Sequence, residues 1–470
     1  MPFMLFGCQS VEQKNFYEIE AVYDDTSKTL TCQQRVEYVN SSENSLGEVC
    51  FFLYANSFAE GETAVSTAYT HKAYPNGESY ANITIQSVKV GGEEGAFSVE
   101  ENSILNVGLK SELFQEEIVT IEMEYVVKLA NIRHRLGFND KTVNFGNFFP
   151  IACVYEDGEG FVKPQFSANG DPFYSDISDF EVKISYPESY VLATSGQQME
   201  TSGGETKTTT CRAENVRDFA FVLSTEFQKL SAKVGEVVVN YFSYEDENAH
   251  AHLETACKAV GTFEELFGDY PYAQLSVVKA GFCFGGMEYP NLVMIADDLK
   301  DDGTFDYVIV HEIAHQWWYG MVGNNEFEEA WVDEGLTEFS TALFYEKNPD
   351  YGLEYQEIMT NATATYQNFV KIYTDINGDV SERMDRNLLQ FDTEPEYVNC
   401  TYTKGMLLFN ALRQTMSERK FFNCLKDYFE AMKFKNSSAE KMVECFSKSS
   451  RINLETFFEA WISGQVLIGS

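Results

Sequence analysis

The sequence predicts a multidomain protein in which an antiparallel, sandwich-like β region comes first and an α+β, mainly helical region follows. Two observations indicate this order. Before residue 225 or so, runs such as EIVTIEMEYVV alternate or concentrate β-branched and aromatic residues, and turn clusters such as GGEEG separate them. After residue 250 or so, segments such as AHAHLETACKAVGTFEELFG show helical periodicity with a glycine stop. The length of 470 residues also exceeds what one hydrophobic core usually supports.

The elements can be placed along the chain in this order. We expect a β-rich domain over residues 1–228, with strands in FYEIEAVYDD, TLTCQQRVEYVN and FEVKISYP. A second domain then covers residues 229–470, with a helical lobe from about residue 345. In it, two short strands, QLSVVKA and NLVMIA, bracket FGGMEYPN, and two helices follow in FDYVIVHEIAHQWWYGMV and FEEAWVDEGLTEFSTALFYEK. The second of these helices should end before Pro349.

Charge and composition exclude several classes of partner. The chain has 34 basic and 73 acidic residues and a formal charge of −39. Such a surface repels phosphate backbones, so we expect no nucleic-acid partner. The favoured interpretation of this charge is that it keeps the protein soluble; the alternative is that it attracts cationic substrates. No apolar run reaches eighteen residues, which predicts no transmembrane segment.

The sequence is compatible with two cellular locations of the protein. The ten cysteines are scattered, which is typical of free thiols in a reducing setting and favours a cytoplasmic protein as the chain stands. Leu5-Phe6-Gly7-Cys8, however, resembles the end of a bacterial lipoprotein signal. Cys8 would then anchor the protein to a membrane if an upstream signal segment is missing. The sequence gives no indication of the oligomeric state.

The strongest local signal is HEIAH, from His311 to His315. Two histidines four positions apart lie on one face of a helix, so both imidazoles can reach one ion. Glu312 projects beside them, where it can hold a water molecule and accept its proton. The alternative, two unrelated histidines on a helix, is disfavoured because the flanks VIV and WWYGM are apolar and unpaired imidazoles in a core are costly. We therefore predict one zinc ion per chain.

A catalytic zinc site needs a third protein ligand. Glu334 in WVDEGLTEF follows His315 on the next helix, at a spacing that lets the chain turn around and return alongside. Glu338 lies one turn further on the same face, where it can accept a hydrogen bond from a ligand imidazole; the alternative is a plain surface glutamate. Asp333 should point elsewhere and be solvated.

These motifs resemble the gluzincin zinc aminopeptidases, the family of aminopeptidase N and leukotriene hydrolase. The ordered matches are GGMEY, HEIAHQWWYG, WVDEG and Tyr402-Thr403-Lys404-Gly405, and the lead-in FGDYPYAQLSVV matches as well. The resemblance implies a saddle-shaped β domain followed by a thermolysin-like catalytic domain. It also implies peptide substrates with a free N-terminus.

The resemblance further assigns roles to residues. It implies that His311, His315 and Glu334 bind zinc and that Glu312 is the general base. Tyr402 would stabilise the oxyanion. The segment from Gly285 through Gly286 and Met287 to Glu288 would bind substrate, with Glu288 holding the free α-amine. Tyr397, near a tyrosine of the family, is interpreted as a packing residue.

Three departures from the family pattern stand out. Tyr289 replaces an asparagine of the substrate loop and precedes Pro290, which predicts altered side-chain preference or activity. The β region lacks the family's glutamine-containing stretch, and VNFGNFFPIACVYEDG stands in its place. The chain stops where large members continue into a long helical domain, so we expect a more open site.

The predicted function is therefore a zinc metallo-aminopeptidase. The first alternative is a zinc endopeptidase or another zinc hydrolase of altered specificity, because Tyr289 and a missing lid would admit longer chains. The second is a non-catalytic binding module, which has no physical need for Glu312 or Tyr402.

Overall fold

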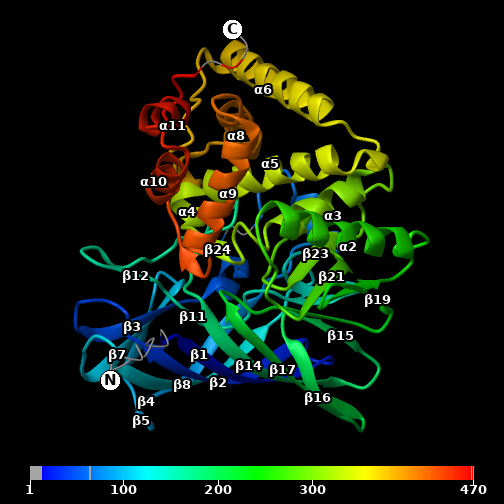
Figure 1. Ribbon diagram of the computed structural model, residues 1–470. Coiled ribbons are helices and arrows are strands. Elements are labelled where there is room, and N and C mark those ends of the chain that lie inside the picture. Colours follow the sequence, from blue (N-terminus) through cyan, green and yellow to red (C-terminus); the bar gives the residue numbers. More distant parts are fainter. Residues whose placement is uncertain (1–12, 63–64, 467, 469–470) are drawn as a thin grey trace, which may run out of the picture.

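The computed structural model describes residues 13–62, 65–466 and 468, so Cys8 lies outside the described residues. The β-rich part forms the lower half of Figure 1 and the helices lie above it. Its largest sheet has eight strands in the order β16-β17-β14-β1-β2-β8-β4-β5. The bounds in that order are Gln197–Ser202, Thr206–Val216, Ser178–Pro187, Asn15–Asp24, Thr29–Val39, Ile118–Lys128, Asn82–Val90 and Glu93–Glu94.

The large sheet differs from expectation at one pair of strands. β1 and β14 run parallel, whereas the other neighbours in this sheet are antiparallel. The reason is connectivity, because β14 lies beside β1 only after a long excursion of the chain through other sheets. The β region is antiparallel as predicted, with this one parallel pair as an exception.

Two four-stranded sheets and a two-stranded sheet of β12 (Tyr155–Glu156) and β13 (Gly160–Phe161) complete the β-rich part. One four-stranded sheet has the order β11-β3-β7-β6 and the other β15-β18-β10-β9. Buried residues of the eight-stranded sheet and of both four-stranded sheets, such as Tyr17, Phe51 and Phe221, join one hydrophobic core. The bounds are β3 (Leu46–Phe52), β6 (Phe97–Glu100), β7 (Ile104–Leu113), β9 (Leu136–Phe138), β10 (Val143–Phe145), β11 (Ile151–Ala152), β15 (Val191–Thr194) and β18 (Phe221–Ser224).

A five-stranded sheet connects this part to the helices. Its order is β19-β20-β21-β23-β22, with bounds Gln228–Val234, Val237–Ser243, Gln274–Ala280, Leu292–Ala296 and Gly286–Met287. Successive side chains of its strands point to opposite faces of the sheet, and each face packs into a different hydrophobic core. Val278 and Met294 join the core of the β-rich part, and Val277 and Val293 join the helical core. The division at residue 228 stays a prediction.

Two helices carry the predicted metal motif. α3 (Thr304–Ala314) packs on the five-stranded sheet and on α2 (Ala249–Leu266), and α5 (Trp331–Lys347) packs on α3. The helix expected through WWYGMV stops earlier, because α3 ends at Ala314 and turns follow it. Tyr319 in this segment has a φ of 127°, which a helix does not allow, and the chain enters β24 (Val322–Gly323). Asn325 caps the short α4 (Glu326–Glu329) that leads into α5.

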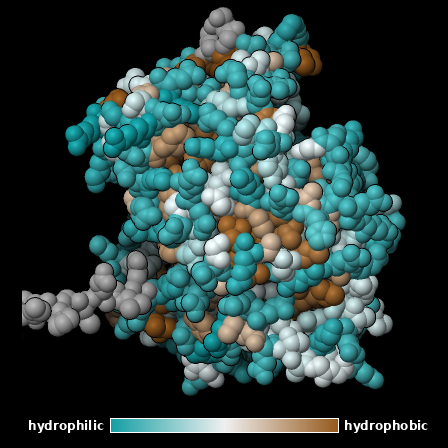
Figure 2. Space-filling model, turned by 45° about the vertical axis from the view of Figure 1, so that its right-hand side comes forward, coloured by the Kyte–Doolittle hydropathy of each residue, from teal (hydrophilic) through white to brown (hydrophobic). Residues whose placement is uncertain are grey.

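The remaining helices build the upper layer in Figure 1. Among the described helices, none is long and apolar enough to cross a membrane. Hydrophilic side chains cover most of the face in Figure 2, and hydrophobic ones gather in its middle. The helices are α1 (Thr70–Ala73) in the β-rich part and α6 (Tyr355–Asn377), α7 (Glu394–Val398), α8 (Lys404–Gln414), α9 (Glu418–Met432), α10 (Ala439–Ser450) and α11 (Glu455–Ile462) above it.

Candidate metal centre and its pocket

Three predicted ligands meet between α3 and α5. The Glu334 Oε2 atom lies 3.5 Å from His311 Nε2 and 3.1 Å from His315 Nε2. All three donor atoms lie within 4.8 Å of one another. Two metal–ligand bonds of about 2 Å at a tetrahedral angle separate their donors by about 3.3 Å, so this set fits zinc.

The second nitrogen of each imidazole fixes the orientation of its ring. His311 Nδ1 lies 2.8 Å from Glu338 Oε2, and Tyr307 donates to the other oxygen of Glu338 at 2.6 Å. His315 Nδ1 lies 2.9 Å from the Trp318 carbonyl oxygen and 3.1 Å from Thr337 Oγ1. With Nδ1 engaged in this way, Nε2 of each ring faces Glu334, and the tautomer protonated at Nδ1 leaves this nitrogen available as a metal ligand.

Glu312 lies next to the donors and against the glycine pair. A Cβ atom at Gly286 would lie 2.2 Å from Glu312 Oε1, so a side chain there would displace this carboxyl group from its present position. Burial raises the pKa of Glu312 to about 7, although the two neighbouring imidazoles lower it. A carboxyl group with a pKa near neutrality is suited to accept and return a proton.

Glu288 is a buried carboxylate with an unsatisfied oxygen. Its residue is 4% exposed, and its Oε1 atom has no hydrogen-bond partner in the part of the chain that the structure describes. Burial raises its pKa well above the usual range, and nearby His315 lowers it. Gln316, which follows His315, fixes the loop: its Nε2 donates to the Tyr289 carbonyl at 3.2 Å, and its Oε1 accepts from Asn291 N at 2.7 Å. The carboxylate is thus held at a set place relative to the donors.

These groups share a cavity of about 310 Å³, which we call the metal pocket. Tyr402 lies in its wall, with its ring stacked on His311 at 6.0 Å and its hydroxyl donating to Glu334. Tyr397 packs edge-on against Tyr402. The metal pocket is lined by Tyr54, Tyr69, Arg135, Ser167, Ala168, Asn169, Gly170, Asp171, Phe284, Gly285, Gly286, Glu288, Tyr307, Val308, His311, Glu312, His315, Glu334, Glu338, Glu394, Tyr397, Val398 and Tyr402.

Met287 is not among these lining residues. Its side chain is fully buried and joins the core of the β-rich part. Side chains alternate along a strand, so the neighbours of Met287 face the pocket and its own side chain does not. A contact with substrate would therefore involve its backbone.

Asp333 contradicts the expectation of a solvated side chain. It is 3% exposed, accepts from Asn324 Nδ2 at 3.0 Å and lies 4.0 Å from His315 Nδ1. The physical reason is that α5 runs through the helical core, so its first turns have no solvent face. Burial raises the pKa of Asp333 to about 7, and neighbouring Glu334 adds to the rise.

Sequence reasoning did not find the ion pair of Arg135 with Asp171 in the metal pocket. Both residues come from the β-rich part, and Arg135 is 4% exposed with its guanidinium 5.2 Å from the ring centre of Phe173. Neither residue belongs to a local motif. A buried arginine more than 170 positions before the metal ligands gives no signal in one sequence.

Tyr289, the departure in the substrate loop, points away from the pocket. Its side chain is fully buried, and its hydroxyl donates to Asn147 Oδ1 in the β-rich part. Gly146 makes this possible, because a Cβ atom there would lie 2.0 Å from the Tyr289 hydroxyl oxygen. Asn147 belongs to VNFGNFFPIACVYEDG, so two departures from the family pattern contact each other.

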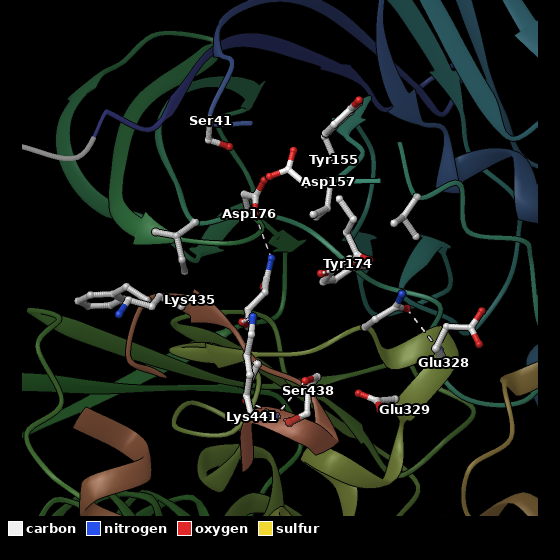
Figure 3. A pocket seen from close by; sticks show the side chains of 18 of the residues that line it. Ser41, Tyr155, Asp157, Tyr174, Asp176, Glu328, Glu329, Lys435, Ser438 and Lys441 are labelled. Carbon is white, nitrogen blue, oxygen red and sulfur yellow. Dashed lines mark hydrogen bonds between the residues drawn. The ribbon is translucent and has the colours of Figure 1, made fainter. Parts of the chain in front are cut away.

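A larger hollow of about 1140 Å³, which we call the groove, opens between the β-rich part and α10 (Figure 3). Several of its polar side chains have hydrogen-bond partners in side chains or in the backbone. Asn436 donates to Asp176 at 2.9 Å, and Ser438 accepts from Lys441 N at 3.2 Å. None of the groups that can hold a metal among the described residues lies there.

Comparison with known proteins gives three findings. Residues 251–461 match the Peptidase family M1 domain. Over 202 residues the chain is 30% identical to aminopeptidase B of Rattus norvegicus, and over 186 residues it is 29% identical to leukotriene A-4 hydrolase of Xenopus laevis. These matches cover 40% and 38% of this chain, but only 29% of each relative's length.

The third finding concerns the fold. The crystal structure of an M1 zinc metallopeptidase from Deinococcus radiodurans aligns with a TM-score of 0.68 at 15% identity, covering 97% of this chain and 96% of that one. The predicted order of a β-rich part followed by a mainly helical part is confirmed.

Proposed function

From the premise that this chain carries a peptidase family M1 domain, we propose that it is a zinc-dependent aminopeptidase. It would hydrolyse the first peptide bond of peptides that have a free N-terminus. The observation that carries this proposal is Glu288, a buried carboxylate in the same pocket as the three metal donors. Its Oε1 has no hydrogen-bond partner among the residues that the structure describes. An unsatisfied buried carboxylate is costly, and a substrate ammonium group removes that cost.

His311, His315 and Glu334 would hold the zinc ion, and Glu338 would keep the His311 ring in place. When bound, zinc polarises the carbonyl of the scissile bond and makes water a better nucleophile. Glu312 accepts the proton of the attacking water and later donates it to the leaving amine. Tyr402 turns its hydroxyl from Glu334 to the developing oxyanion. Glu288 holds the α-amine, so that only the first peptide bond lies beside Glu312.

A substrate panel tests this proposal. Wild type is expected to release amino acids from aminoanilides and short peptides, and a chelator is expected to stop it. Glu312→Ala should lower kcat by about a hundredfold or more with zinc content unchanged. Glu288→Ala should lower kcat/KM for free-amine substrates and erase their advantage over N-acetylated peptides.

Each alternative corresponds to a different outcome of the panel. Efficient cleavage of N-acetylated peptides by wild type would indicate an endopeptidase. Purified protein with no zinc and no hydrolysis would indicate a binding module. If Glu288→Ala kept the requirement for a free amine, the proposed amine anchor would be wrong.

A further inference from the structure

We propose that the metal pocket selects peptides with an arginine or lysine at the second or third position, and that Glu394 recognises this cationic side chain. The inference rests on the proposed aminopeptidase function and adds a substrate class to it. It starts from the direction in which a peptide must run through the pocket.

The segment from Phe284 to Glu288, which has the short strand β22 (Gly286–Met287) at its centre, sets this direction. Glu288 lies at one end, Gly286 lies against Glu312 two residues earlier, and Phe284 lies two residues earlier again. Both a strand and an extended peptide rise by about 3.3 Å per residue. A peptide with its amine at Glu288 and its first peptide bond at Glu312 therefore continues toward Phe284. The residues after the scissile bond lie at that end of the pocket.

Glu394 lies at the same end. The ring of Phe284 contacts the ring of Tyr69, with centroids 4.8 Å apart. Burial, and then interaction with the neighbouring Glu394 carboxylate, raise the pKa of the Tyr69 hydroxyl to about 12. All three residues line the metal pocket, and Glu394 is half-buried. Aromatic rings beside a carboxylate suit a guanidinium or ammonium group, which gains from both.

The other carboxylates of the pocket already have partners or a proposed role. Asp171 pairs with Arg135, and Glu338 contacts His311 and Tyr307. Glu334 faces both imidazoles, Glu312 is the proposed base and Glu288 the proposed amine anchor. For Glu394, the described residues include no basic ion-pair partner. Its interaction with the uncharged Tyr69 hydroxyl leaves its negative charge unbalanced, so it can pair with a cationic side chain. The formal charge of −39 attracts such peptides from solution.

The test uses two series of peptide amides, Leu-X-Ala and Leu-Ala-X, in which X is arginine, lysine, glutamine or glutamate. Release of leucine gives kcat/KM for each peptide. In at least one series, wild type should prefer arginine and lysine over glutamine by about three- to fivefold, with glutamate lowest. Glu394→Gln should bring the arginine-to-glutamine ratio close to one, and Glu394→Lys should reverse the order of arginine and glutamate.

Glu328→Gln is the matched control, because it neutralises an exposed carboxylate of the groove (Figure 3) and should keep the wild-type ratio. An arginine-to-glutamine ratio that is the same in wild type and Glu394→Gln would overturn the inference. So would a wild-type ratio near one in both series. Leucine aminoanilide has no residue after the scissile bond, so its hydrolysis by wild type tests the proposed function separately.

Discussion

The metal pocket and the groove are both hollows of this protein, and they differ in how their buried polar atoms are satisfied. The groove is larger, about 1140 Å³ against about 310 Å³. Yet no residue lining it has a buried side-chain oxygen or nitrogen without a partner among the described atoms, whereas Glu288 in the metal pocket does. Leaving a buried carboxylate unpaired costs free energy, so such an atom marks a place for a ligand better than volume does.

Replacing one tyrosine in each hollow gives the largest expected contrast. Tyr402→Phe should lower kcat by about 10²- to 10³-fold, because it removes the proposed donor to the oxyanion. Tyr174→Phe removes a hydroxyl that donates to Glu156 at 2.7 Å in the groove, and kcat should stay within about twofold of wild type. Steady-state kinetics with zinc quantified in each sample makes the comparison. Equal kcat values for the two variants would contradict the role of Tyr402.

A pair of glutamates sharpens the comparison further. Glu338→Ala should weaken zinc binding by about 10- to 100-fold, because His311 loses the carboxylate that orients its ring. Glu328→Ala in the groove should leave zinc affinity unchanged. Competition with a chelator of known affinity measures both. If Glu338→Ala binds zinc as tightly as wild type, Glu338 is only a neighbour of the site.

The sequence predicts those parts of the site whose residues are close together along the chain, and it does not predict those whose residues are far apart along it. His311 and His315 are four positions apart, and so are Glu334 and Glu338. On a helix, residues at this separation lie on the same face, so the sequence alone predicts that the two members of each pair are neighbours. Glu288 could be placed only through the family resemblance. The ion pair of Arg135 with Asp171 depends on packing between distant segments, which no local pattern encodes.

The fold shows the same limit. Alternation predicts the strands, but the parallel pairing of β1 with β14 depends on a long connection. Burial was misjudged at Asp333 for a related reason. Asp333 is expected to point away from the metal face and therefore into solvent, but its helix lies between α3 and α8, so that other face is buried as well.

The smallest expected effect concerns the substrate loop, where Tyr289 differs from the family pattern. Its hydroxyl donates to Asn147 across the two parts of the molecule, while Gln316 holds the backbone of the same loop on the other side. Tyr289, the residue after Glu288, is therefore held by its side chain on one side and by its backbone on the other. Loss of one hydrogen bond of about 1 kcal/mol should loosen the loop without removing the carboxylate.

Tyr289→Phe should therefore raise KM for free-amine substrates by about three- to tenfold and change kcat less. The matched control is Tyr272→Phe, because the Tyr272 hydroxyl also crosses between the two parts, donating to the Asn215 carbonyl at 2.7 Å, but it lies outside the pocket. Thermal unfolding of both variants measures the shared loss of stability. A KM that rises equally in the two variants would mean that Tyr289 acts only through the stability of the interface. A rise in Tyr289→Phe alone would make it the residue that positions Glu288.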